Sequence, residues 1–379
     1  MILSKLKKIV FLTGTRADFG KLKSLIKITQ ESPNYDVQIF ATGMHLDEKY
    51  GFTINEIYKS GFKNISSYKN TAGAQFMDRT LAKTIEGFSM YISNQKPDLI
   101  IVHGDRVEAL AGAIVGSLNT ILVAHIEGGE ISGTIDELIR HSVSKLAHLH
   151  LVSHEEAKKR LIQMGELESS VYVIGSPDLD LMNPLNLPKL SGVKKYYNIS
   201  FDRYAIAMFH SVTTEYDRIK QQSEIFINTL IASNKNYILI YPNNDLGTDE
   251  ILKTYESIKD NPKFKIFPSV RFEYFLRLLK EAEFIIGNSS AGVREAPFYK
   301  VPTIDIGTRQ KNRVKGNTII NVSCNREEIT HAIHNCKQVF DKEIESHEFG
   351  AGNSDALFYN LLNSDALWNV NCQKQFQDL

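Results

Sequence analysis

Four carboxylates near the middle of the chain are of the residue types that proton-transfer chemistry needs. The segment VAHIEGGEISGTID, residues 123–136, begins as an apolar run and then places Glu127, Glu130 and Asp136 in a short loop, while Asp105 follows an earlier apolar run, DLIIV. Carboxylates placed close together raise one another's pKa, so one can be protonated and another ionised at neutral pH. This pattern indicates a general acid and base set. The alternative is a helix start capped by Thr134 or Asp136, and Glu130 is the carboxylate that we expect to serve only that helix.

Several histidines follow or interrupt apolar runs. His103 and His125 lie in or beside such runs, where a satisfied core histidine is the commoner outcome. His210, in FHSVTTE, follows an apolar run and could protonate or hydrogen-bond a leaving phosphate. His148 and His150, with His154 nearby, have a spacing that suits a metal, but no carboxylate cluster adjoins them in sequence, so we expect no metal site.

A possible phosphate cradle lies in GNSSAGVREAP, residues 287–297. An apolar run ends there in two glycines and two serines, after which a helix is expected to begin. Backbone N–H groups at such a helix start bind anions, with Ser289 and Ser290 as added donors, and Glu295 is near enough to reach a ribose diol. Ordinary Ser or Asn capping is the alternative, although capping does not require both glycines and both serines.

Arginines follow two further apolar runs. Arg16 lies in GTRADFG, where it could present a fixed fork to a phosphate or carboxylate or could pair with Asp18. The segment is not G-x-G-x-x-G, which disfavours a nicotinamide cofactor. Arg309 and Arg313 lie in GTRQKNR, a basic run that could also be merely solvated.

The elements that must position these residues are repeated strand and helix units. Apolar runs such as KKIVFLTGT, PDLIIVHGD and TILVAHIEGG alternate with helical patterns and read as strands buried on both faces of a parallel sheet. Three prolines between 175 and 197 suggest a linker, after which the same alternation restarts. We therefore predict α/β architecture with two doubly wound, Rossmann-like domains facing a cleft: residues 1–180 with the carboxylates, 200–355 with the phosphate cradle, and a C-terminal helix in 356–379.

Composition narrows the class of partner. The 44 lysines and arginines balance the 44 aspartates and glutamates, which removes the electrostatic argument for nucleic acid or a membrane surface as partner. No apolar run reaches the ~20 residues of a membrane span and no signal peptide pattern is present, so we expect a cytoplasmic protein. The three cysteines suggest no chemistry. A sugar-like group joined to a nucleoside diphosphate would fit carboxylates on one domain and a phosphate cradle on the other, without a cofactor.

The motifs taken together resemble a known family. GTRADFGKL, HGDRVEALAG, HIEGGEISGTIDELIRHSVSKLAH, FHSVTTE, YPNND, GNSSAGVREAP and GTRQKNR occur in this order over nearly the whole chain and are similar to the hydrolysing UDP-N-acetylglucosamine 2-epimerases of sialic acid biosynthesis. The resemblance implies a glycosyltransferase-B-type fold, a C-terminal helix that crosses back to the N-terminal domain, and a homodimer or homotetramer. It also implies that UDP-N-acetylglucosamine and water give N-acetylmannosamine and UDP through a 2-acetamidoglucal.

The resemblance also assigns roles to matching positions. Asp105, Glu127 and Asp136 become the acid and base carboxylates, and His210 assists the departure of UDP. Candidates for binding the UDP-sugar are Arg16, Arg106, Ser289, Ser290, Glu295, Arg309 and Arg313. No metal is implied.

Four alternatives remain open at this point. The same chemistry could act on UDP-2,4-diacetamido-2,4,6-trideoxyglucose, en route to legionaminic acid, and a non-hydrolysing epimerase would instead return UDP-N-acetylmannosamine. A non-catalytic regulator would bind a sugar nucleotide without turning it over, although the three retained carboxylates argue against it. A glycosyltransferase would require an acceptor.

Overall fold

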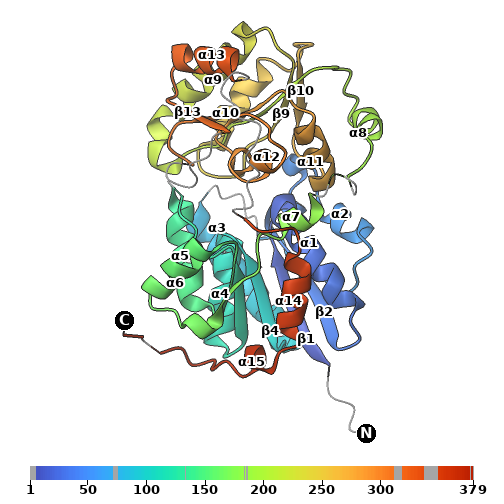
Figure 1. Ribbon diagram of the computed structural model, residues 1–379, viewed down its shortest axis with the longest axis vertical. Helices are drawn as coiled ribbons and strands as arrows, with labels where there is room; N and C mark the ends of the chain where they lie inside the picture. Colours follow the sequence, from blue (N-terminus) through green and yellow to red (C-terminus); the bar gives the residue numbers. More distant parts are fainter. Residues whose placement is uncertain are drawn as a thin grey trace. The chain divides into compact units, whose positions relative to one another are not determined.

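The computed structural model describes residues 6–70, 76–132, 134–182, 184, 187–310, 318–336, 349–375 and 377–378. The chain divides into two compact units (Figure 1). The first unit comprises Met1–Glu130, Asp136–Asn183 and Glu348–Leu379, and the second comprises Ile131–Ile135 and Pro184–His347. Each unit is built on its own parallel sheet. The predicted class, two doubly wound α/β domains, is therefore confirmed.

Among the described residues, the first unit holds a seven-stranded sheet in the order β3-β2-β1-β4-β5-β6-β7. Its strands are β1 Lys7–Thr13, β2 Tyr35–Ala41, β3 Ile65–Ser67, β4 Leu99–His103, β5 Leu122–Ile126, β6 Leu149–Val152 and β7 Val171–Val173. Its helices are α1 Arg16–Glu31, α2 Ile54–Lys59, α3 Met77–Gln95, α4 Val107–Leu118, α5 Ile135–Leu146, α6 Glu155–Gln163, α7 Asp178–Leu181, α14 Ser354–Leu362 and α15 Asp365–Trp368. The strand order reverses between β1 and β4, which is where open α/β sheets bind ligands.

The central strands of this sheet are buried along their whole length. Every residue of β4 (LIIVH) and of β5 (LVAHI) is buried, because helices cover both faces of the sheet. The two strands pair in parallel, with His103 opposite Ile126, so the loops that follow them leave the sheet side by side. Helix α1 begins at a capping box in which Thr15 and Asp18 bond each other's backbone N–H groups.

The second unit holds a six-stranded sheet in the order β10-β9-β8-β11-β12-β13, the order 3-2-1-4-5-6 of dinucleotide-binding folds. Its strands are β8 Ala205–Met208, β9 Tyr237–Ile240, β10 Phe264–Phe267, β11 Ile285–Gly287, β12 Thr303–Ile306 and β13 Ile319–Val322. Its helices are α8 Leu190–Tyr196, α9 Ile219–Ala232, α10 Thr248–Glu256, α11 Phe272–Lys280, α12 Glu295–Phe298 and α13 Arg326–Asn335. The switch point lies between β8 and β11.

Some elements differ from the predicted ones. The segment 175–197, which was expected to be a linker, contains α7 and α8, and the short strands β3 and β13 were not predicted. These elements have only three to seven residues, too few for a period to stand out. None of the helices in the described part of the chain has both the length and the apolar character needed to cross a membrane.

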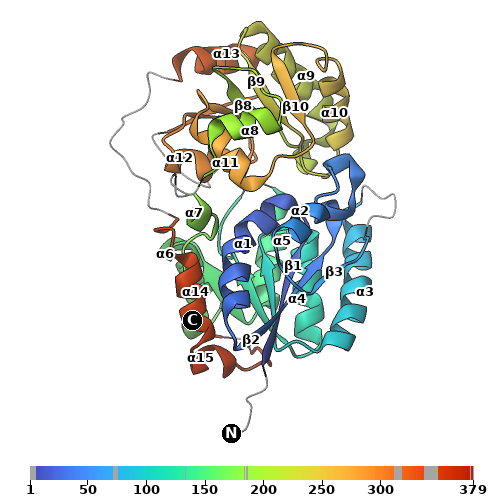
Figure 2. The same cartoon turned by 90° about the vertical axis from the view of Figure 1, so that its right-hand side faces the viewer.

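The C-terminal segment packs on the first unit. Figures 1 and 2 show α14 beside α1, although the two helices are more than 300 residues apart in sequence. Phe358, Leu361 and Leu362 of α14 join the hydrophobic core around β1 and β2. The Asp180 carboxylate accepts hydrogen bonds from the backbone amides of Ser354 and Asp355, at 2.8 and 3.0 Å, and so supplies the start of α14 with an acceptor from α7.

A buried ionic cluster in the first unit is centred on Glu166. Its carboxylate lies 2.9 Å from His150 Nε2, 2.7 Å from Lys145 Nζ and 2.5 Å from Lys374 Nζ, and its side chain is 1% exposed. Burial by itself would raise the pKa of Glu166, but hydrogen bonds and charges from these partners lower it from 4.5 to about 2. The ionised carboxylate therefore stabilises the folded chain.

We expect Glu166→Gln to lower the free energy of unfolding by about 3 kcal/mol at neutral pH, the equivalent of that pKa difference. Because the folded pKa is depressed, this contribution is complete above pH 4.5 and is lost as the pH falls through about 2. Chemical unfolding of the wild type and of Glu166→Gln at several pH values measures the difference in their free energies of unfolding. Glu168→Gln, at a side chain that is 72% exposed, is the control and should change little. A wild-type advantage that persists undiminished near pH 2 would contradict the prediction.

Candidate active site

Glu127 occupies the first position after β5 and is held in an unusual backbone conformation. Its φ is +71°, in the left-handed region, which costs a residue with a side chain about 1 kcal/mol or more and is concentrated at functional sites. The side chain is only 6% exposed, and Oε2 lies 2.9 Å from His103 Nε2 and 3.7 Å from Lys21 Nζ. A buried carboxylate thus sits between two basic groups, one from β4 and one from α1.

Lys21 links a second buried carboxylate to this group. Its Nζ is 3.9 Å from Asp178 Oδ2, and the Asp178 side chain is 1% exposed. Sequence reasoning did not single out Lys21, Asp178 or a contact between His103 and Glu127. The helical spacing of α1 gave a signal for Lys21. This lysine is next to Leu22 and four residues before Leu25, so it lies on the inner face of the helix, where both leucines are fully buried.

Asp105 follows β4 and is paired with an arginine that the sequence did not reveal. The guanidinium of Arg140, on α5, donates to the Asp105 carboxylate and, at 3.3 Å, to the carbonyl oxygen of Glu130. Arg140 is fully buried. It therefore joins the loop after β4 to the loop after β5. Asp136 lies in the first turn of α5, four residues before Arg140 and hence on the same helix face.

A second contact ties α5 to the same loop. The Ser144 hydroxyl is 3.0 Å from His125 Nδ1, and His125 Nε2 is 2.8 Å from the carbonyl oxygen of Gly104. Burial lowers the pKa of His125 to about 3, so the ring is neutral and its Nε2–H donates to that carbonyl. His125 is a satisfied core histidine whose contacts position the residue before Asp105.

Glu130 has a different partner from the expected one. Its carboxylate is 2% exposed and accepts a hydrogen bond from the Ser153 hydroxyl at 2.9 Å, in the loop after β6. The sequence suggested a role at the start of α5. The neighbouring strand is the reason for the difference, because β6 pairs with β5 and brings Ser153 to this loop.

Arg16 and Arg106 both lie at the switch point of the first sheet. Arg16 is the first residue of α1 and is partly exposed, and Arg106 Nε lies 3.3 Å from Glu108 Oε2. The Asp18 carboxylate accepts hydrogen bonds from the backbone amides of Gly14 and Thr15, and burial raises its pKa. Asp18 therefore acts as part of the helix cap.

The switch point of the second sheet is organised by Asn288. Its side-chain oxygen accepts from the His210 amide at 2.6 Å, and its side-chain nitrogen donates to the His210 carbonyl at 2.9 Å. The Asn243 amide donates to His210 Nδ1 at 3.1 Å. A ring nitrogen that accepts carries no proton, so neutral His210 has its proton on Nε2 and is a donor there.

Two further side chains converge on Asn288. The side chains of Arg309 and Gln310 both donate to the backbone carbonyl oxygen of Asn288, at 3.3 and 2.9 Å, and both residues are buried. The hub formed by Asn288 thus brings His210 and Arg309 together. Asn288 and Gln310 were not among the site residues expected from the sequence. Arg313 lies outside the described residues.

The expected phosphate cradle has a different local structure. Ser289 accepts from the Ala291 amide at 3.3 Å and caps a short 3-10 helix, Ser290–Gly292, and α12 then spans only Glu295–Phe298. The expected helix is present as α12, but the 3-10 helix precedes it, and α12 is short because Lys300 adopts a left-handed φ of +55° and Pro302 follows. Ser289 and Ser290 are partly exposed, whereas Glu295 is 3% exposed.

Comparison with known proteins identifies the family. Residues 27–363 match the UDP-N-acetylglucosamine 2-epimerase family. The chain belongs to this family. A UDP-N-acetylglucosamine 2-epimerase of Neisseria meningitidis is 46% identical over 99% of this chain and all of its own length. A hydrolyzing UDP-N,N'-diacetylbacillosamine 2-epimerase of Legionella pneumophila is 33% identical over 94% of this chain and 96% of its own length.

The fold of this UDP-N-acetylglucosamine 2-epimerase family member also matches solved structures. The Methanocaldococcus jannaschii UDP-GlcNAc 2-epimerase, crystallised in complex with UDP-GlcNAc and UDP, superposes with a TM-score of 0.79 at 25% identity, covering 94% of this chain and 99% of its own. The match supports the glycosyltransferase-B-type fold, with seven strands in one parallel sheet and six in the other. The chain is therefore an enzyme of the UDP-N-acetylglucosamine 2-epimerase family.

In this epimerase-family chain, the three histidines whose spacing suits a metal each contact another group of the protein. His148 Nδ1 accepts from the Val123 amide at 3.0 Å, His150 contacts Glu166, and His154 caps α6. Within the described ranges, no three His, Cys, Asp or Glu side chains are grouped so as to hold a metal ion.

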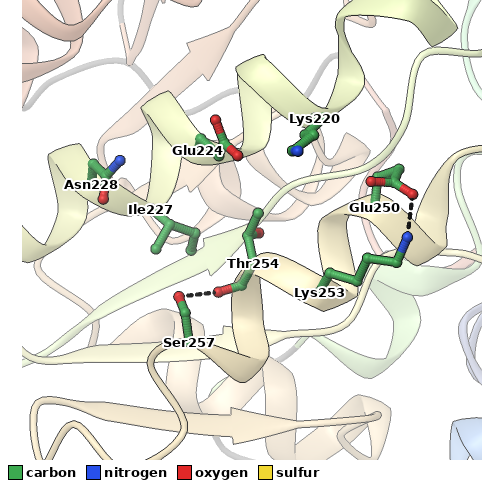
Figure 3. Close-up of a pocket in the computed structure, with 8 residues that line it drawn as sticks. All are labelled: Lys220, Glu224, Ile227, Asn228, Glu250, Lys253, Thr254 and Ser257. Atoms are coloured by element: carbon green, nitrogen blue, oxygen red, sulfur yellow. Dashed lines mark hydrogen bonds and ion pairs between the residues drawn. The ribbon is translucent and has the colours of Figure 1, made fainter.

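A hollow on the second unit lies between α9 and α10 (Figure 3). Lys253 pairs with Glu250 at 2.5 Å, one turn away on α10, and Ser257 bonds the Thr254 carbonyl at 2.6 Å. Both contacts join residues of α10 or of its carboxyl-terminal cap. None of the predicted site residues of this family member lines the hollow, so we do not assign the sugar nucleotide to it. Its lining residues are Lys220, Glu224, Ile227, Asn228, Glu250, Lys253, Thr254 and Ser257.

Proposed function

We propose that this enzyme is a hydrolysing UDP-N-acetylglucosamine 2-epimerase, which converts UDP-N-acetylglucosamine and water into N-acetylmannosamine and UDP. The observation that carries the proposal is the buried Glu127 carboxylate between His103 and Lys21. The hydrolyzing Legionella relative supports the use of water. The overall reaction is redox-neutral, so its balance requires no oxidant or reductant.

The proposed chemistry has two steps. A carboxylate takes the weakly acidic C2 proton of the sugar while the bond from C1 to the diphosphate oxygen breaks, which leaves UDP and a 2-acetamidoglucal. Water then adds its oxygen to C1, and a proton is delivered to C2 with inversion. Asp105, Glu127 and Asp136 are the candidate acids and bases. Both steps need a group that is ionised and a group that is protonated, which neighbouring carboxylates with different partners can supply.

The second unit is proposed to bind UDP. His210 would donate its Nε2–H to the departing diphosphate and so stabilise the charge that develops as the C1 bond breaks. Ser289 and Ser290 would donate to phosphate oxygens, and Glu295 would accept from the ribose hydroxyls. The arginines proposed for the diphosphate or the sugar are Arg16, Arg106, Arg309 and Arg313.

We expect Arg313→Ala to weaken UDP binding by about tenfold, because a charge-assisted hydrogen bond to phosphate is lost. Titration calorimetry with UDP measures the affinity. Arg326→Ala, at an exposed residue of α13, is the matched control and should bind UDP as the wild type does. Unchanged affinity in Arg313→Ala would remove Arg313 from the proposed site.

Proton NMR with UDP-N-acetylglucosamine in heavy water tests the function. N-acetylmannosamine deuterated at C2, together with free UDP, is the expected product. UDP-N-acetylmannosamine without free UDP would show a non-hydrolysing epimerase. Binding without turnover would leave a regulator, or a different substrate. The second candidate substrate is UDP-2,4-diacetamido-2,4,6-trideoxyglucose, and the name of the Legionella relative supports it. The same assay with that sugar nucleotide distinguishes the two candidate substrates.

The assembly and the pathway remain predictions. The resemblance to the family implies a homodimer or homotetramer, which sedimentation measures directly. A place in sialic acid biosynthesis depends on N-acetylmannosamine being the product, so the NMR experiment decides that prediction too.

A further inference from the structure

The C-terminal tail, residues 369–375, holds the carboxyl end of α5. Lys374 Nζ donates to the carbonyl oxygens of Ser144, Lys145 and Ala147, at 3.3, 3.0 and 2.7 Å. His148, just beyond α5, approaches the carbonyl oxygen of Cys372 at 2.9 Å through Nε2. Figure 1 shows the tail running from α15 along one end of the first unit to the side where α5 and α6 lie.

These contacts have a clear physical consequence. The last carbonyl groups of a helix lack partners within the helix and carry the negative end of its dipole. One ammonium group supplies hydrogen bonds to three carbonyls and a positive charge at that end. The same ammonium reaches Glu166 Oε2 at 2.5 Å, which anchors it to the loop after α6. The carboxyl end of α5 is thus contacted by a residue more than 220 positions later in the chain.

Helix α5 also contacts the loop that carries one of the candidate acids and bases, Asp105. Ser144, whose carbonyl Lys374 binds, also contacts His125, which bonds the carbonyl of Gly104 beside Asp105. One turn earlier, Arg140 donates to the Asp105 carboxylate. Asp136 lies on the same helix. A continuous set of contacts therefore runs from the tail to the loop after β4.

We propose that Lys374 is a positioning residue for the acid and base groups of this enzyme. It holds α5 in the register at which Arg140 and Ser144 orient the loop that carries Asp105, and at which Asp136 projects from the first turn. The proposal rests on the proposed function for the identity of the reaction. The contacts themselves do not depend on it.

Steady-state kinetics of three variants test the proposal. Lys374→Met is expected to lower kcat about tenfold or more, since small displacements of reacting groups cost rates of that order. UDP affinity should stay within about twofold, because the proposed phosphate and ribose contacts of Ser289, Ser290 and Glu295 lie on the other unit. Lys374→Arg should recover most of the loss. Lys145→Met is the matched control, because Lys145 contacts the same Glu166 carboxylate but none of the three carbonyl oxygens at the end of α5, and it should keep kcat within about twofold.

Hydrogen exchange separates failure of this proposal from failure of the proposed function. We expect amides of α5 to exchange faster in Lys374→Met than in Lys145→Met, whether or not the wild type turns over UDP-N-acetylglucosamine. Wild-type kcat and wild-type exchange in Lys374→Met would overturn the proposal. A parallel loss of kcat and UDP affinity would also overturn it, because that result would show general unfolding rather than a displaced helix.

Discussion

Glu127→Gln is expected to lower kcat by at least about 100-fold, the usual range for a lost general acid or base. The amide has the shape of the carboxylate but cannot take up or release the proton. His103 and Lys21, which now face an ionisable oxygen at 2.9 and 3.7 Å, would face a neutral group. UDP affinity should stay within about twofold, since Glu127 is not among the proposed UDP contacts, and those of Ser289, Ser290 and Glu295 lie on the second unit. Single-turnover kinetics with UDP-N-acetylglucosamine and calorimetry with UDP measure the two effects separately.

Glu130→Gln provides the matched control for this experiment. Glu130 lies in the same loop and is also buried, but its carboxylate bonds Ser153. We expect its substitution to affect stability more than turnover. Near-wild-type turnover in Glu127→Gln would show that Glu127 is neither the acid nor the base. Equal losses of turnover in both variants would assign the effect to the loop as a whole.

Asn288→Ala is expected to have the second large effect. The substitution leaves the amide and the carbonyl of His210 without their partners at a position that is 1% exposed. Each buried group that loses its partner costs about 1–3 kcal/mol, so we expect a loss of about 2–6 kcal/mol in the free energy of unfolding. UDP affinity should fall at least about tenfold, because the backbone of His210 loses the side chain that holds it, although Arg309 keeps the backbone carbonyl of residue 288 as its acceptor. Chemical unfolding and calorimetry measure these quantities.

Asn243→Ala is the control for Asn288→Ala. Asn243 also contacts His210, but it does so through its backbone amide, which alanine retains. We expect UDP affinity close to that of the wild type in this variant. If Asn288→Ala bound UDP as tightly as Asn243→Ala, the proposed hub would not organise the UDP site.

Several features of the fold and site could be read from residue order. Uninterrupted apolar runs such as LIIVH and LVAHI predicted strands buried on both faces, and the structure places them at the centre of the first sheet. The rule that ligands meet the carboxyl ends of parallel strands then located the loops containing Asp105, Glu127 and His210. The local structure directly after β11 was not predicted, because a strand followed by Gly, Ser and Ser does not reveal the 3-10 helix Ser290–Gly292 that precedes α12.

The partners of these residues could not be read in this way. Arg140 is 35 residues from Asp105, Asn288 is 78 residues from His210, and Lys374 is more than 200 residues from α5. Each is a polar residue in a helical or loop pattern, with no local sign of the contact that it makes. Such contacts depend on strand order and register, which no spacing along the chain records.

The sequence by itself therefore determined the class of fold, the loops that carry polar residues and the family to which the chain is similar. These follow from local periodicity and from motifs, which act over a few residues at a time. The tertiary structure alone decided which group each ionisable side chain contacts: Glu127 with His103 and Lys21, Asp105 with Arg140, and Glu130 with Ser153. The physical reason is that burying a charged or polar group is costly unless a partner compensates it, and in a doubly wound sheet that partner comes from a neighbouring strand or helix distant in sequence.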